Sequence, residues 1–236
     1  MSLLLEAVVL SWAAGFTAFL GAVIARLERL PEGELKQEIQ HGVVGLGGGI
    51  LVAAVAFALA PKGIENLNVY VLAALATAGG ISFFGLDEFL MRHGGSKAQF
   101  LAMLMDFIPE AIALGALFAH EHRLGLMLAL LIGAQNLPEG FNSYRELIAA
   151  RSTRRSALTW LLAVSLFGPA AAALGHFLLR GHPKLTAGMM TFAAGGILYL
   201  VFQVIAPLAK MKRHWAPPLG AVLGFVIGMI GAKLLG

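Results

Sequence analysis

Two pairs of polar residues lie in the middle of apolar stretches of the chain. Asp106 and Glu110 stand four residues apart in DFIPE, and Gln135 and Glu139 stand four residues apart in QNLPEG. In a helix, residues four apart lie on one face, about one turn from each other. Each pair therefore presents two oxygen-bearing side chains to a single point, which is an arrangement that can bind a metal cation.

Each pair also encloses a proline, Pro109 in the first stretch and Pro138 in the second. Proline has no N–H group, so it cannot donate a hydrogen bond to the carbonyl four positions earlier, here that of Met105 and that of Ala134. We therefore expect both helices to kink and to leave a free carbonyl beside the polar pair. Transporters build cation sites from interrupted helices near the middle of the membrane.

The composition indicates that these residues lie in a lipid environment. Hydrophobic residues make up 58% of the 236 positions and charged residues 13%, whereas soluble domains contain about 25% charged residues. Eight apolar runs are long enough to cross a bilayer as helices. They cover approximately residues 3–25, 41–60, 69–90, 100–119, 124–148, 157–179, 186–208 and 217–235. We predict an all-α polytopic membrane protein with a single transmembrane domain over residues 1–236.

The distribution of basic residues predicts the orientation in the membrane. Eight spans would place both termini on one side. Of the 17 Lys and Arg residues, all except Lys62, Arg123, Arg180, Lys184 and Lys233 lie on the side shared by the first, third, fifth and seventh loops. By the positive-inside rule this side is cytoplasmic, and both termini lie outside the cell membrane, which in a bacterium is the inner membrane. Because the basic residues form short clusters between spans, we expect no nucleic-acid partner.

The motifs resemble the signature of the ZIP (Zrt/Irt-like) divalent-metal transporters. A Pro-Glu pair preceded by a polar residue is followed on the next helix by Gln-Asn-Leu-Pro-Glu-Gly at 135–140. The segments GILVAAVAFALAPKGIE and TFAAGGILYLVFQVIAP are similar to the second and seventh helices of that family. The resemblance implies two three-helix repeats of inverted topology around a central helix pair. It also implies that this pair, the fourth and fifth helices, holds a two-metal centre.

Carried over residue by residue, the resemblance implies a first metal site formed by Asp106, Glu110, Gln135 and Glu139. Asp106 departs from the family pattern, which usually has His at this position. Because the chain has no Cys, the donors would be three carboxylates and one amide. Such a hard donor set moves the preference toward Mn²⁺ or Fe²⁺ relative to Zn²⁺, which also accepts carboxylate ligands.

The second metal site of the family is mostly lost in this chain. Phe107 replaces the Asn of the fourth helix, and Ala111 replaces the glycine that follows the Pro-Glu pair. Gly168 replaces the Glu of the sixth helix. Only Asn136 and the shared Glu139 remain as ligands from that site, so we predict a single metal site.

Two functions fit these residues. The first is transport of a divalent transition-metal ion (Zn, Mn or Fe) as substrate, without a cofactor, through one site between the fourth and fifth helices. The second is a membrane protein that keeps the ZIP fold and binds or senses metal without transporting it. The replacement of a seventh-helix acid by Gln203 also favours this second function. We do not expect an enzyme, because the chain has no HExxH or GxSxG motif. A homodimer is possible, and the sequence does not decide whether one forms.

Other polar residues leave alternatives open. The HEH sequence at 120–122 could capture metal at the outer entrance, but we favour a solvated loop. His176 could be a hydrogen-bonded interface residue, a ligand along the pathway or a proton carrier. Asn142 and Ser143, one turn beyond the second polar pair, could extend a polar path toward the cytoplasm, and Glu146 could end it.

Overall fold

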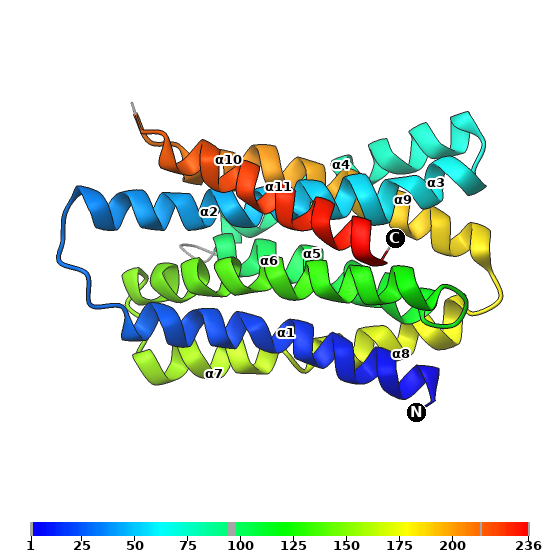
Figure 1. Cartoon of the computed structure of the whole chain (residues 1–236), viewed down its shortest axis with the longest axis horizontal. Coiled ribbons are helices and arrows are strands. Elements are labelled where there is room, and N and C mark those ends of the chain that lie inside the picture. The colour runs from blue at the N-terminus through cyan, green and yellow to red at the C-terminus, as the bar shows by residue number, and fades with distance from the viewer. Residues whose placement is uncertain (1, 94–97, 213, 236) are drawn as a thin grey trace.

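The fold is a bundle of helices that lie along one long axis (Figure 1). The computed structural model describes residues 2–93, 98–212 and 214–235. Within these ranges, eight helical segments are long and apolar enough to cross a membrane, which confirms the predicted all-α polytopic architecture. Both termini lie at the same end of the bundle (Figure 1). Two of the counted basic residues, Lys97 and Arg213, lie outside the described residues.

Several of the eight spans consist of more than one helical element. The helices are α1 (Leu3–Leu27), α2 (Glu34–Ala54), α3 (Ala60–Asn66), α4 (Val69–His93), α5 (Ala98–Leu117), α6 (His122–Ala149), α7 (Arg154–Val164), α8 (Phe167–Leu179), α9 (Pro183–Leu200), α10 (Ala206–Ala209) and α11 (Ala216–Leu235). The π-helical segment η1 (Val55–Leu59) joins α2 to α3, and η2 (Val201–Ile205) joins α9 to α10. The second span is therefore α2–η1–α3, the sixth is α7 and α8, and the seventh is α9–η2–α10.

The second span is longer than predicted. It begins at Glu34 rather than at 41, and it ends at Asn66. The added turns at its start are amphipathic: Gln40 is buried and donates a hydrogen bond to Glu28, with 3.5 Å between the atoms. The helix therefore begins before the apolar run, because one face of these turns packs on the protein while the other face stays polar.

The sixth span is not the continuous helix predicted over 157–179. α7 ends at Val164 and α8 begins at Phe167. Pro169 has no N–H group to donate to the carbonyl of Ser165, so the helical hydrogen-bond pattern stops there. The Ser165 hydroxyl donates to the carbonyl of Leu162 at 2.6 Å. The other spans agree with the predictions to within a few residues at each end, which is the ordinary uncertainty of helix boundaries.

The prolines of the two polar stretches do not end their helices. Pro109 lies inside α5 and Pro138 lies inside α6, and both helices continue through them without a break. Wide π turns instead come directly before Ala-Pro at Pro61 and Pro207. Prolines and π turns are both common causes of helix bends. The repeated pattern VAFALAP and VFQVIAP is the sequence signal that accompanies these turns.

Glycines allow neighbouring helices to approach closely. α1 packs on α6, α2 on α11, α4 on α9 and α5 on α8. In each pair, a glycine of either helix faces a main-chain carbonyl of the other: Gly140 faces Ala18, and Gly21 faces Leu137. A Cβ atom at these glycines would overlap the carbonyl, which confirms the role of small residues at these interfaces. Inverted repeats would produce such matching pairs, and the repeat relation itself remains a prediction.

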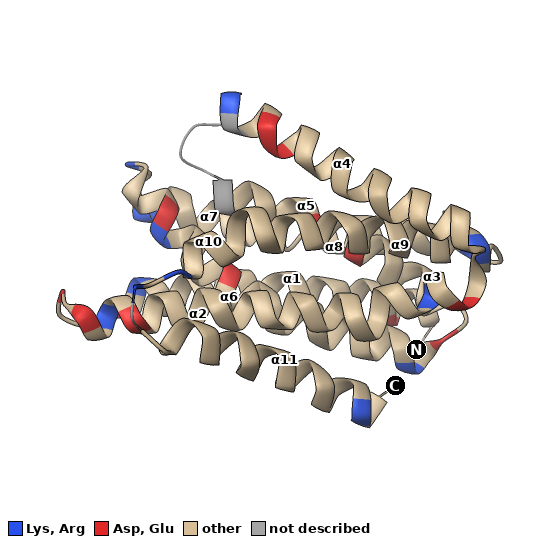
Figure 2. Ribbon diagram, turned by 90° about the horizontal axis from the view of Figure 1, so that it is seen from above, with Lys and Arg blue, Asp and Glu red and all other residues tan. Residues whose placement is uncertain are grey.

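α5 and α6 form the centre of the bundle. They pack on each other, while α8 and α9 cover α5, and α1 and α2 cover α6. Charged side chains lie mainly at the two ends of the bundle, and a few acidic residues lie between the ends (Figure 2). The central pair therefore holds its polar residues in the part of the molecule with the fewest charges.

Candidate metal centre

All five predicted metal ligands are buried in the central helix pair. Asp106 and Glu110 lie on α5, and Gln135, Asn136 and Glu139 lie on α6. None of the five is more than 5% exposed. The helical spacing puts Asp106 and Glu110 on one face of α5, and Gln135 and Glu139 on one face of α6. α5 and α6 pack directly on each other.

Four of the five side chains come together between α5 and α6. The Gln135 amide donates from Nε2 to Oε2 of Glu110, with 2.6 Å between the atoms. Asp106 lies within electrostatic range of Glu110 and Glu139, and Glu139 lies within range of Glu110. Carboxylates this close repel one another. A cation between them would replace that repulsion by attraction.

Several oxygen atoms of this group have no hydrogen-bond partner: Oδ1 of Asp106, Oε1 of Glu110, Oε1 of Gln135 and both carboxyl oxygens of Glu139. Over the described residues, no Lys, Arg or His forms an ion pair with these acids. Buried acceptors without partners are costly, so they call for an explanation. In the described ranges, no group of three or more His, Cys, Asp or Glu side chains is placed so that it could hold a metal ion. The oxygens are therefore buried without partners, and the side chains would have to move for them to surround one ion.

Asn136, the fifth predicted ligand, is turned toward α1. Its Nδ2 donates to the carbonyl of Ala14 at 3.0 Å, while its Oδ1 has no partner. Nearby, the Thr17 hydroxyl of α1 lies 2.7 Å from the carbonyl of Gly133. Both contacts join α1 to α6 beside the polar group. Asn136 thus has a structural contact, and its role as a metal ligand stays a prediction.

Phe107 fills the space beside Asp106 between α5, α1 and α8. Its ring is fully buried. A Cβ atom on Gly168 would lie 2.9 Å from Cζ of Phe107 and 2.6 Å from the carbonyl oxygen of Ser11. A Cβ atom on Gly15 would lie 2.7 Å from the same ring atom. A side chain at position 168 would therefore meet both a ring and the main chain. The sequence showed the two replacements but not that they touch.

Apolar side chains cover the polar group on the side of the predicted outer loops. They are Leu114, Leu117 and Phe118 at the end of α5, and Leu128, Leu131 and Ile132 on α6, all at most 3% exposed. From Glu110 outward along α5, and from Gln135 outward along α6 as far as Leu124, no polar side chain interrupts them. The route to this side is thus closed by hydrophobic contacts.

The HEH sequence at 120–122 makes structural contacts at the outer end. His120 accepts a hydrogen bond at Nε2 from the N–H of Gly181 at 3.0 Å. Glu121 pairs with Lys62 of α3 at 2.6 Å. His122 lies 3.0 Å from Glu6 of α1. These contacts tie the α5–α6 loop to three other parts of the protein, which favours the interpretation as a loop over that of a metal-capture site.

His176 of α8 is buried, and its Nδ1 atom has no hydrogen-bond partner. This atom therefore does not act as a hydrogen-bonding contact between helices. The other two interpretations, a ligand along the pathway and a proton carrier, stay open for it.

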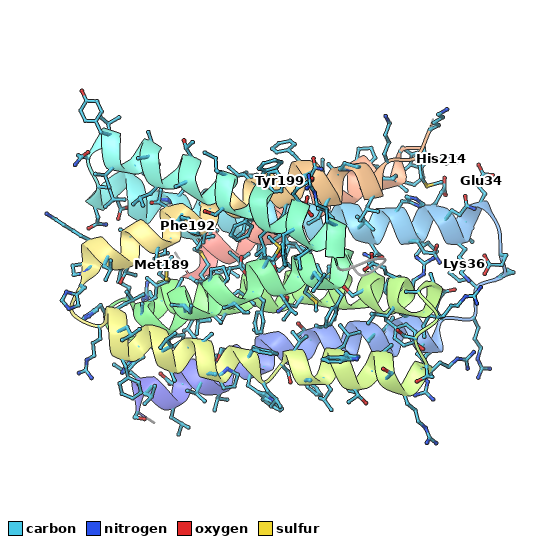
Figure 3. The ribbon with its side chains drawn as sticks, turned by 180° about the vertical axis from the view of Figure 1, so that it is seen from behind. Glu34, Lys36, Met189, Phe192, Tyr199 and His214 are labelled. Carbon is cyan, nitrogen blue, oxygen red and sulfur yellow. The ribbon has the colours of Figure 1, made fainter. Side chains whose placement is uncertain are left out.

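A network of ion pairs lies at the end that is predicted to be cytoplasmic. Lys36 lies 2.7 Å from Glu32. His214 lies 2.8 Å from Glu38 and 3.5 Å from Glu34. Glu34, Lys36 and His214 are found together at this end of the bundle (Figure 3). The network holds the start of α2 against the segment that leads into α11.

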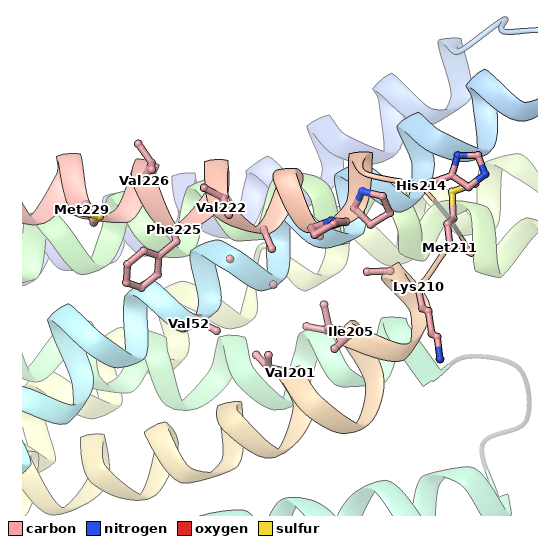
Figure 4. Close-up of a pocket in the computed structure, with 18 residues that line it drawn as sticks. Val52, Val201, Ile205, Lys210, Met211, His214, Val222, Phe225, Val226 and Met229 are labelled. Atoms are coloured by element: carbon pink, nitrogen blue, oxygen red, sulfur yellow. The ribbon is translucent and has the colours of Figure 1, made fainter.

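An apolar groove lies apart from the polar group, between α2, η2 and α11 (Figure 4). Its volume is about 800 Å³. Gly45, Gly48 and Ile205 are among its lining residues, and Lys210 and His214 line one end. Gly48 and Ile205 also line a small cavity beside Glu139. The groove is therefore separated from the polar group by a single layer of residues.

Comparisons with known proteins identify the family. A family model described as ZIP Zinc transporter matches residues 98–235, which is more than half of the chain and includes both polar pairs. The chain belongs to the ZIP family. This ZIP protein is also 28% identical, over 254 aligned positions, to the zinc transporter ZIPB of Bordetella bronchiseptica. That alignment covers 97% of this chain and 81% of ZIPB. The family resemblance drawn from DFIPE and QNLPEG is confirmed.

Proposed function

We propose that this ZIP protein transports a divalent transition-metal ion across the cell membrane through one site between α5 and α6. Asp106, Glu110, Gln135 and Glu139 form the site, with Asn136 at its edge toward α1. The ion is the substrate, and no cofactor or chemical step is involved, so the protein is not an enzyme. The observation that carries this proposal is the set of buried, unpartnered oxygens on all four side chains.

Electrostatics support a cation at this place. A single carboxylate inside a bilayer costs several kcal/mol, and three of them cost more. Within the described ranges, no basic side chain pairs with these three. A divalent ion would supply the missing positive charge. The hydrogen bond from Gln135 fixes one oxygen of Glu110, which leaves the other oxygen to coordinate the ion.

The donor set supports more than one metal. ZIPB, the similar protein from Bordetella bronchiseptica, is named a zinc transporter. Zn²⁺ accepts carboxylate ligands, but three carboxylates and one amide without imidazole or thiolate suit Mn²⁺ and Fe²⁺ as well. We therefore propose that this protein accepts Mn²⁺ or Fe²⁺ in addition to Zn²⁺.

Metal uptake into proteoliposomes tests the proposal. Glu110→Gln and Glu139→Gln each remove one charged ligand while keeping the shape of the side chain. We expect uptake of Zn²⁺ and Mn²⁺ to fall by about tenfold or more, the scale on which metal sites respond to altered ligation. Glu32→Gln makes the same change at an exposed side chain outside the spans and should leave uptake unchanged. Uptake by both site variants at the rate of the wild type would show that the ion passes elsewhere.

A second function, metal binding or sensing without transport, is favoured by one observation. Phe107 and the main chain of Ser11 leave no room for a side chain at position 168, so the second family site cannot assist the passage of an ion. The same experiment separates the two functions. Metal binding by the wild type without uptake would support sensing and would contradict transport.

A further inference from the structure

A row of polar side chains continues along α6 from the metal centre toward the predicted cytoplasmic end. Gln135, Glu139, Asn142 and Glu146 follow one another at intervals of four, three and four residues. Residues with this spacing lie on one face of a helix. In the opposite direction, the same helix face is apolar up to Leu124. The polar row therefore leads from the centre to one side of the membrane only.

Asn142 and its neighbour Ser143 are buried without complete hydrogen bonding. They are 6% and 0% exposed. Nδ2 of Asn142 and Oγ of Ser143 have no partner. A buried polar group without a partner is costly inside a membrane protein, and such a group in a native structure calls for an explanation. A water molecule would accept from Nδ2 of Asn142, and a passing ion or its water would provide the partner of Oγ of Ser143.

Asn142 shares a cavity with Glu139. The cavity has a volume of about 10 Å³, close to the smallest space that holds one water molecule. Its other walls are apolar and come from Val43, Val44, Gly47, Gly48, Pro138 and Ile205. The polar side chains among its lining residues therefore belong to Glu139, whose two carboxyl oxygens are both unpartnered, and to Asn142.

We propose that this cavity is a second position for the transported ion, held by Glu139 and Asn142 one helical turn closer to the cytoplasm. The proposal rests on the transport function proposed above. Because Glu139 belongs to both positions, the ion can exchange Asp106 and Glu110 for Asn142 without losing Glu139. The Asn142 amide would turn its oxygen toward the ion, since O and N of an amide exchange places by rotation.

The composition of this position suits release. One carboxylate and one neutral amide attract a divalent ion less strongly than three carboxylates do. Passage requires binding positions that are weak enough for the ion to leave. Beyond Asn142 on α6, the side chain of Glu146 reaches the start of α5. There its Oε2 accepts a hydrogen bond from the N–H of Phe100, with 3.2 Å between the atoms. The row thus ends with an acid at the predicted cytoplasmic end of α6.

Two variants of Asn142 test the inference, with Mn²⁺ as the probe. Initial uptake into proteoliposomes is measured at saturating Mn²⁺, and equilibrium binding is measured on the purified protein in detergent. In Asn142→Leu we expect the maximal uptake rate to fall by about tenfold, while the affinity of the first site changes by less than about threefold. In Asn142→Asp the added carboxylate should raise bound Mn²⁺ from about one to about two ions per chain.

Gln37→Leu is the matched control, because it makes the same kind of amide-to-leucine change at an exposed position near the start of α2. Its uptake should equal that of the wild type. Uptake by Asn142→Leu at the wild-type rate would overturn the release position and leave the proposed function intact. If Asn142→Leu does not fold, one Mn²⁺ ion per chain in Asn142→Asp would overturn it instead. A wild type with neither uptake nor binding would overturn the proposed function, and this inference with it.

Discussion

Phe107 and Gly168 stand where the resemblance to other ZIP proteins places an Asn and a Glu. In this structure the two positions touch, because Cζ of Phe107 would lie within 2.9 Å of a Cβ atom on Gly168. The carbonyl of Ser11 is even closer to that Cβ position. The second metal site is therefore closed by the main chain as well as by the change of side chains. Restoring the family side chains tests whether the main chain alone keeps the second site closed.

The double variant Phe107→Asn with Gly168→Glu returns the family side chains. We expect it to bind one metal ion per chain, as predicted for the wild type, because the Ser11 carbonyl still occupies the space beside position 168. Removing the buried ring should also lower the free energy of unfolding, by about 3–5 kcal/mol as for other large-to-small core changes. Metal stoichiometry and thermal unfolding in detergent measure the two effects. Phe107→Leu serves as the stability control, and a second bound ion in the double variant would contradict the prediction.

At the scale of helices, the close glycine contacts determine how α1, α5, α6 and α8 surround the metal centre. Gly140 follows directly after Glu139, and it faces the carbonyl of Ala18 on α1. The depth of the Glu139 carboxyl group therefore depends on how closely α6 can approach α1. A methyl group at this glycine would push the two helices apart.

Gly140→Ala should lower the free energy of unfolding by about 1–3 kcal/mol, the usual range for overpacking in a tight interior. Gly133→Ala, on the same helix, is the control, because its nearest neighbour would lie 3.6 Å away, at Cα of Ala14. The control should be as stable as the wild type or slightly more stable, since alanine favours helices more than glycine does. Thermal unfolding in detergent compares them. Equal stability of the two variants would show that the α1–α6 contact is less tight than described.

The spans could be predicted from the sequence because crossing a bilayer requires about 20 apolar residues in a row, whatever the neighbouring helices are. The break at Ser165 and the early start at Glu34 were missed. At Glu34 the added turns are amphipathic, so the apolar pattern does not include them. At Ser165 the apolar pattern continues through the break, so it does not mark the break. The kinks expected at Pro109 and Pro138 stay a prediction, because α5 and α6 continue through these prolines as helices and a continuous helix can still bend at a proline.

The shared helix faces of the polar residues in the candidate metal centre were predictable in the same way, because residues four apart share a face in any helix; that these residues bind metal stays a prediction. The contact of Phe107 with Gly168, and the cavity shared by Glu139 and Asn142, were not predictable. They depend on how α5 meets α8 and how α6 meets α2. Such contacts join residues that are far apart in the sequence, and no spacing rule within one helix describes them.

At the scale of the whole molecule, the charge distribution predicts which end faces the cytoplasm. The chain has no Cys, so a single introduced cysteine reports the side on which it lies. Asn68→Cys, between α3 and α4, should react with a membrane-impermeant maleimide on intact cells. Arg155→Cys, at the start of α7, should react only after the membrane is opened, because its loop is predicted to be cytoplasmic. The wild type is the unlabelled control, and the reverse pattern would show the opposite orientation.

Gly48 and Ile205 line both the apolar groove on the surface of the bundle and the cavity beside Glu139. A hydrophobic compound dissolved in the bilayer can enter the groove without passing through water on either side. There it would press on Ile205, with the cavity of Glu139 on the far side of that residue. The proposed ion path would therefore be open to inhibition from within the lipid, by compounds that do not compete with the metal ion for its ligands.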